Sequence, residues 1–169
     1  MSPPQFAQLY TVHGLKDAHH VVGCYGLLPN KQGETYVEFL RQVQRLLNGA
    51  TPETIMIDFE QACINAIIRV FPHAAVYGCH FHLYKSIFRH IQSEGLQQRY
   101  MENEDFRTNM RMICALAFVP LADIVTSFEA LSLHCTDDQE HIILDYFETN
   151  YIGEQRRGRR RRPLFAHSM

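Results

Sequence analysis

The spacing of apolar residues divides the chain into two halves with different predicted structure. Apolar runs over residues 5–12 and 21–28 are separated by a short polar loop, which is typical of two neighbouring antiparallel strands. After residue 79 the strand pattern ends, and apolar residues recur every three or four positions instead. The pattern therefore predicts a first half that contains strands and a second half built from helices.

The strand pair is followed by a predicted helix. Apolar residues over 36–47 fall on one helical stripe, and Asn48 and Gly49 supply a stop signal after it. Thr35 and Glu38 have the spacing of a capping box. We therefore expect the helix to begin at Thr35 and to end near Asn48.

A second strand, helix and strand follow. Residues 55–57 form a short apolar run with two β-branched isoleucines, which suits a buried strand. Asp58 stands where this strand would end. The stripe over 59–70 predicts a helix that Pro72 closes, and residues 74–77 predict another strand. The order β-β-α-β-α-β indicates an α/β fold with a mixed sheet covered by helices.

Helical stripes account for most of the second half. Pro120 is expected to open one of these helices, because proline is favoured at the first helical position. The apolar stripes lie within residues 83–91, 106–117, 121–131 and 142–147.

Charge is distributed unevenly along the chain. The 169 residues include 16 basic and 18 acidic side chains, for a net charge of −2. Six arginines lie between residues 156 and 162, so the rest of the chain is acidic and this segment is strongly basic. Such a segment predicts an anionic partner or a nuclear import signal. The candidate DNA-binding residues are Arg156, Arg157, Arg159, Arg160, Arg161 and Arg162.

The number of cysteines and the hydropathy of the chain indicate the kind of compartment in which the protein is found. Five cysteines are an odd number, and the first residues lack the apolar core of a secretory signal. We therefore expect a reducing compartment, with most cysteines buried as small apolar residues. The sequence also lacks an apolar run of about 18 residues that could span a bilayer.

Asp58 has two interpretations that its sequence context leaves open. A carboxylate at a strand end is typical of enzymes that hold two metal ions, although several such ligands are needed. Alternatively, Asp58 and Gln61 have capping-box spacing, so Asp58 could cap the following helix.

Cys79 and His82 form a second candidate site. Three positions apart in a helix, they would share a face and could bind one zinc ion, although structural zinc usually takes four ligands. The alternatives are a buried cysteine beside an exposed histidine, and a nucleophilic pair that lacks an orienting third group.

Several motifs resemble those of Mutator-like element (MULE) transposases. The densest are I-D-F-E-Q-A-x-x-N-A from residue 57 and F-P-x-A-x-V-x-G-C-H-F-H from residue 71. Q-L-Y-T-V-H-G at 8–14, G-L-x-x-x-Y at 95–100, R-M-x-x-A-L-A-F-x-P at 111–120 and Y-F-E-T-N-Y-I-G at 146–153 are similar too. The resemblance covers nearly the whole chain.

The resemblance implies an RNase H-like fold and DNA as the partner. In that family a D-D-E triad binds two divalent metals, Mg²⁺ or Mn²⁺, which cleave DNA and transfer its strands. Asp58 matches the second acid, while Cys79 and His82 match the C-x-x-H signature. We accordingly predict a partial RNase H-like core over 1–78, a helical insertion over 79–153 and an arginine-rich, disordered tail over 154–169.

The remaining family acids have no match in this chain. A D-G-T-F-like motif is expected before Gln8 and a T-N-N-x-x-E-like motif beyond the helical insertion, and Glu148 does not match the latter. The sequence therefore predicts a nuclear, transposase-derived domain that lacks its first strand, is truncated at both ends and is inactive alone.

The sequence is also compatible with two other functions. One is a binding module for nucleic acid or protein that has no enzymatic activity, with homo-oligomerisation as a further option. The other is a metal-dependent nuclease that recruits its missing ligands from His13, Asp17 or Glu60.

Overall fold

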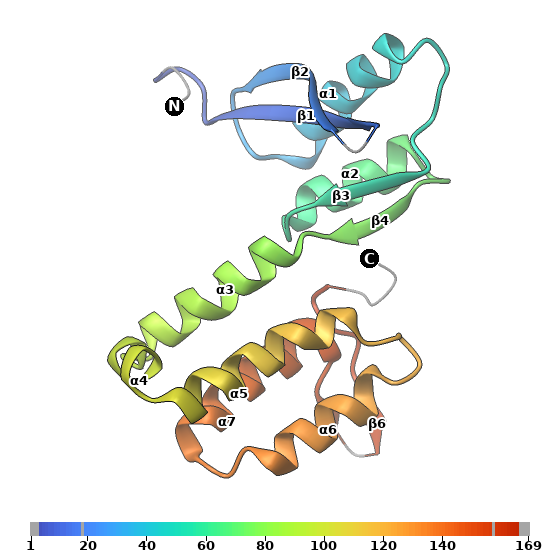
Figure 1. Ribbon diagram of the computed structural model, residues 1–169. Helices are drawn as coiled ribbons and strands as arrows, with labels where there is room; N and C mark the ends of the chain where they lie inside the picture. The colour runs from blue at the N-terminus through green and yellow to red at the C-terminus, as the bar shows by residue number, and fades with distance from the viewer. Residues whose placement is uncertain (1–3, 18, 157, 166–169) are drawn as a thin grey trace. The chain divides into compact units, whose positions relative to one another are not determined.

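The computed structural model describes residues 4–17, 19–156 and 158–165 of the chain (Figure 1). It divides into two compact units, Met1–Val76 and Tyr77–Met169. The first unit is mixed α/β and the second is mainly helical, so the predicted α/β class and the change of structure near residue 79 are confirmed.

The first unit begins with an antiparallel hairpin of strands β1 (Gln8–Lys16) and β2 (His19–Leu28). A bulge between Val12 and His13 interrupts the register of the two strands. Helix α1 (Gly33–Leu46) packs on one face of the hairpin (Figure 1). The predicted strand pair is thus confirmed.

Helix α1 begins by different means than the sequence suggests, but it ends as predicted. Its N-cap is Gln32, which forms no capping side-chain hydrogen bond, so the predicted capping box of Thr35 and Glu38 is wrong. The Thr35 hydroxyl instead donates to the side-chain oxygen of Asn30, at 2.7 Å, and thereby joins the first turn to the preceding loop. Past the helix, Asn48 has a positive φ of 50°, as the predicted stop signal requires.

Strand β3 (Thr54–Ile57), helix α2 (Gln61–Val70) and strand β4 (Ala75–Gly78) follow. The boundary of the first unit falls within β4. β3 pairs with β4, and α2 packs against α1. The described residues therefore form separate β1–β2 and β3–β4 pairs in place of the single mixed sheet that the sequence predicts.

The second unit is built around helix α5 (Glu104–Ala115), which packs against α3, α6 and α7. Its buried stripe carries Phe106, Met110 and Ile113, each at most 1% exposed. The Asn103 side chain accepts a hydrogen bond from the Phe106 backbone N–H at 2.8 Å and so caps the helix. The other elements are α3 (His80–Ser93), α4 (Gln97–Glu102), η1 (Leu116–Phe118), α6 (Ile124–His134), α7 (Asp138–Phe147), the π-helical turn η2 (Glu148–Ile152), β5 (Gln155–Arg156) and β6 (Arg159–Arg160).

Proline does not open α6 as predicted. This helix begins at Ile124, four residues after Pro120, because turns occupy the intervening positions. Leu121, which the sequence places on the apolar stripe, is consequently 61% exposed. In the described part of the chain we find no helix with the length and apolar character that crossing a membrane requires.

Gly26 allows the close packing between the hairpin and α1. A Cβ atom at this position would overlap the ring of Phe39. We therefore predict that Gly26→Ala lowers the free energy of unfolding by about 1–3 kcal/mol, as overpacking does. Urea denaturation followed by circular dichroism would measure the change. Gly14→Ala is the matched control, because a Cβ at Gly14 meets no atom within 4 Å; equal effects of the two substitutions would contradict this explanation.

Candidate functional site

Asp58 lies directly after β3 and is partly buried. The helix that follows has Glu60, not Asp58, at its N-cap, and it forms no capping side-chain hydrogen bond. Gln61 donates to Asn65 at 2.9 Å instead of reaching back toward Asp58. The predicted capping box is therefore wrong, since Asp58 stands two residues before the N-cap.

A half-buried phenol and a buried thiol lie near Asp58. The Tyr10 hydroxyl and the Cys63 sulfur are 3.2 Å apart and form a hydrogen bond between β1 and α2. Burial, together with the negative charges of Asp58 and Glu60, raises the pKa of Cys63 to about 11, although the Tyr10 hydrogen bond acts to lower it. Burial, the Cys63 hydrogen bond and the Asp58 charge likewise raise the pKa of Tyr10. Both groups are neutral near pH 7, so Cys63 is not an activated nucleophile.

Glu60 is held by a chain of hydrogen bonds. The Gln8 amide donates to the Tyr36 hydroxyl at 2.7 Å, and that hydroxyl donates to Glu60 at 2.6 Å. Lys31 forms an ion pair with the second Glu60 oxygen at 3.5 Å. Burial, followed by the bond to Glu60, raises the pKa of Tyr36 above its ordinary value. The Glu60 carboxylate therefore ties α2 to α1 and β1.

Sequence reasoning did not single out Tyr10 or Tyr36. The sequence signal that could have identified Tyr10 is the alternation of side chains along β1. Gln8, Tyr10 and Val12 are its more buried positions, whereas Leu9 and Thr11 are exposed. The partners of both tyrosines lie more than 20 residues away in the sequence, in α2 for Tyr10 and in β1 and at the N-cap of α2 for Tyr36.

The other acids and the histidine considered as metal ligands lie apart from this cluster. The His13 ring is hydrogen-bonded to Thr11 at 3.2 Å, on an exposed stretch of β1. Asp17 lies in the turn that follows β1, with a positive φ of 49°.

The residues described do not fit the metal ions that the family resemblance implies. Two-metal catalysis requires several carboxylates converging on one place. Within residues 4–17, 19–156 and 158–165 there is no group of three His, Cys, Asp or Glu side chains arranged to hold a metal ion. Asp58 therefore has no set of companion ligands among these residues, and we derive no metal-dependent step.

Cys79 and His82 occupy the start of α3. Cys79 is the N-cap residue, and its carbonyl accepts hydrogen bonds from the backbone N–H groups of His82 and Leu83. Cys79 is partly exposed and His82 is exposed, with its ring edge against Phe81 at a centroid distance of 5.5 Å. Cys79 thus accepts the first backbone hydrogen bonds of α3 without a side-chain cap, and the capacity of the pair for zinc stays a prediction.

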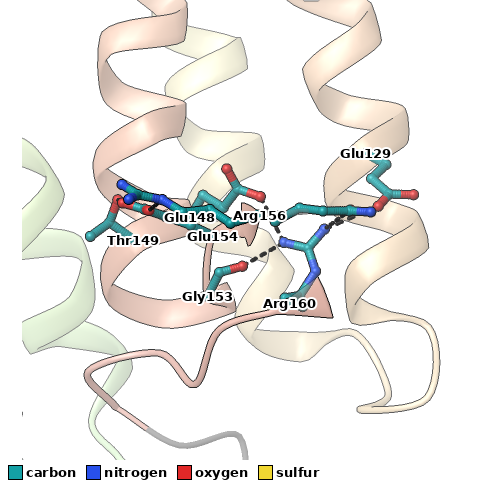
Figure 2. A network of polar contacts seen from close by, with 8 residues as sticks. Glu129, Glu148, Thr149, Gly153, Glu154, Arg156 and Arg160 are labelled. Atoms are coloured by element: carbon teal, nitrogen blue, oxygen red, sulfur yellow. Dashed lines mark hydrogen bonds and ion pairs between the residues drawn. The ribbon is translucent and has the colours of Figure 1, made fainter. Parts of the chain in front are cut away.

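The predicted tail contains a short hairpin of β5 and β6, which brings Arg160 back toward the helices. Figure 2 shows the Arg160 guanidinium between Glu148 and Glu129, with which it pairs at 2.6 and 3.0 Å. The guanidinium also donates to the Gly153 carbonyl at 2.6 Å. Only 19% of the Arg160 side chain is exposed. This arginine is therefore part of the folded second unit.

Gly153 makes the tight path of this segment possible. Its φ is +90°, a conformation that side chains disfavour, and a Cβ atom here would overlap the Arg161 carbonyl. Glu154, which follows, receives a hydrogen bond from Thr149 and pairs with Arg156 at 2.8 Å (Figure 2). These contacts lower the pKa of the Glu154 carboxyl.

The remaining arginines of the run differ from Arg160 in exposure. Arg159, Arg161 and Arg162 are exposed, and Arg156 is exposed but paired with Glu154. Arg157 lies outside the described residues. From the sequence alone the six arginines are equivalent. In the structure Arg160 is mostly buried and paired with two glutamates, whereas Arg159, Arg161 and Arg162 face solvent.

Comparison with known protein families gives one match. The model of the MULE transposase domain matches residues 4–86, a range that contains Asp58, Cys79 and His82. No curated protein and no solved structure matches the chain.

The contacts of Arg160 predict a role in stability. Arg160→Ala would leave Glu148 and Glu129 without their cation, so we expect it to lower the free energy of unfolding by about 1–3 kcal/mol. Arg159→Ala, in the same strand but exposed, should change that energy by at most about 0.5 kcal/mol. Urea titration of both variants checks this, and equal stability of the two proteins would contradict it.

Proposed function

Since this chain is a MULE transposase-derived protein, we propose that it functions as a DNA-binding domain that does not cleave DNA by itself. The match of residues 4–86 to the MULE transposase domain carries this proposal. Members of this family are generally metal-dependent and act on DNA, so DNA is the ligand that the match favours.

The order of elements in the first unit supports an RNase H-like origin. The hairpin β1–β2, helix α1 and the β3-α2-β4 segment follow one another as the family resemblance implies. Asp58 stands at the end of β3, where the second catalytic acid is expected. We propose that Asp58 keeps this position and is not sufficient for two-metal chemistry, which needs several carboxylates.

The exposed arginines of the second unit supply charge for DNA contact. Arg159, Arg161 and Arg162 face solvent, so each can approach a phosphate. Phosphate contacts of this kind give affinity without reading sequence. The same basic run also favours nuclear import, which we propose as the route to DNA.

DNA binding should depend on these three arginines and on salt. We expect the variant Arg159→Gln/Arg161→Gln/Arg162→Gln to bind duplex DNA at least about tenfold more weakly, with a salt slope smaller by about 3. Fluorescence anisotropy over a series of salt concentrations measures both. Arg41→Gln/Arg45→Gln, which removes exposed charge from α1, is the control for net charge. Unaltered affinity and slope in the triple variant would remove the role of the arginine run.

Cleavage assays test the catalytic part of the proposal. We expect the full chain to leave labelled DNA intact in Mg²⁺ or Mn²⁺, and Asp58→Asn to bind DNA as the original chain does. Metal-dependent cleavage that disappears in Asp58→Asn would overturn the proposal and establish a nuclease. A chain that binds neither duplex nor single-stranded DNA would instead favour a module for protein partners.

A further inference from the structure

Two phenylalanine rings in the second unit face solvent. Phe81, in the first turn of α3, is 62% exposed, and Phe118, at the end of η1, is 74% exposed. By contrast, Phe106, Phe128 and Phe147 of the same unit are at most 5% exposed. The core of this unit is therefore well supplied with aromatic residues, and Phe81 and Phe118 are not needed to fill it.

Each of these two exposed rings is paired with a histidine ring. The His80 ring lies against Phe118, with centroids 4.7 Å apart and planes at 45°. The His82 ring meets Phe81 edge-on, at 5.5 Å and 82°. Because His80, Phe81 and His82 are consecutive, the four rings lie around the first turn of α3.

The charge around these rings is positive. The Lys85 ammonium lies 5.9 Å from the centroid of Phe81, within the range of a cation–π contact. Residues 79–93, which include all of α3, also contain Arg89 and have neither Asp nor Glu. The charge complementarity is therefore to an anionic ligand, although the chain as a whole is acidic.

We propose that His80, Phe81, His82, Lys85 and Phe118 form a binding surface for single-stranded DNA, here called the aromatic surface. Exposed rings stack on unpaired bases, and neighbouring cations contact the phosphates of the same strand. Bases within a duplex are already stacked and paired, so their faces are not accessible to Phe81 and Phe118. An apolar protein partner would not account for the lysine beside Phe81.

This inference rests on the proposed function only in taking DNA as the ligand, because the aromatic surface and the arginine run are separate segments of the chain. The run contacts phosphates of either duplex or single strand, whereas the aromatic surface requires unpaired bases. The two proposals therefore predict different effects on the two forms of DNA.

The test compares single-stranded and duplex DNA by fluorescence anisotropy with the full chain. The probe is a labelled oligothymidylate of about 12 nucleotides, within the usual site sizes, beside a duplex of mixed sequence and similar length. We expect Phe81→Ala and Phe118→Ala each to weaken single-strand binding by about 5-fold to 150-fold. Duplex affinity should change by less than about 2-fold, because phosphate contacts dominate it.

Conservative and remote variants separate stacking from general apolar character. Phe81→Tyr and Phe118→Tyr keep a ring and should retain single-strand binding, whereas Phe81→Leu should lose it. Leu133→Ala removes a side chain that is 84% exposed on α6 and should have no effect. Urea unfolding of every variant confirms that the fold is intact, as the exposure of both phenylalanines predicts.

The possible outcomes distinguish failure of the aromatic surface from failure of the proposed function. Unchanged single-strand affinity in the alanine variants, or equal loss with single strand and duplex, would overturn the aromatic surface. If the arginine variants still weaken duplex binding in that case, the proposed function stands. Absence of all DNA binding would overturn both, and self-association lost in Phe81→Ala would identify a protein interface instead.

Discussion

The hydroxyl of Tyr36 is the interaction on which the first unit depends most. Its side chain is fully buried, and it joins three elements by accepting from Gln8 in β1 and donating to Glu60 at the start of α2. A buried polar group costs free energy unless it is paired, so Gln8 and Glu60 must both be in place. The hairpin, α1 and α2 are thereby fixed around one oxygen atom, close to Asp58.

The surroundings of Asp58 follow from this arrangement. Tyr10 packs its ring against Tyr36 and Phe39, with centroids 5.8 and 5.3 Å away, and turns its hydroxyl to Cys63. Tyr10 and Cys63, whose pKa values the Asp58 charge raises, are thus an uncharged phenol and an uncharged thiol. Such groups can shape a site and limit its solvent, but neither one can replace a carboxylate as a ligand of Mg²⁺.

Sequence patterns predicted the local structure better than the contacts that join it. The hairpin, α2 and the helices after residue 79 follow from apolar periodicity, which reflects burial on one face. The capping boxes failed because each depends on the starting residue of a helix, and Gly33 and Gln61 start these helices. The pairing of Tyr36 with Glu60 joins residues that are 24 positions apart, which local spacing cannot reveal.

The arginine run shows the same limit. Its composition predicts an interchangeable cationic tail, yet the β5–β6 turn at Gly158, with φ +78°, brings one particular arginine between two glutamates. The position of an arginine within the run therefore determines whether it contacts these glutamates, and composition alone does not show this. Because residues 159–162 are all arginine, inserting or deleting one of them would place another arginine where Arg160 lies. The repetition thus makes this contact tolerant of small changes in length, although only one guanidinium at a time lies between the two carboxylates.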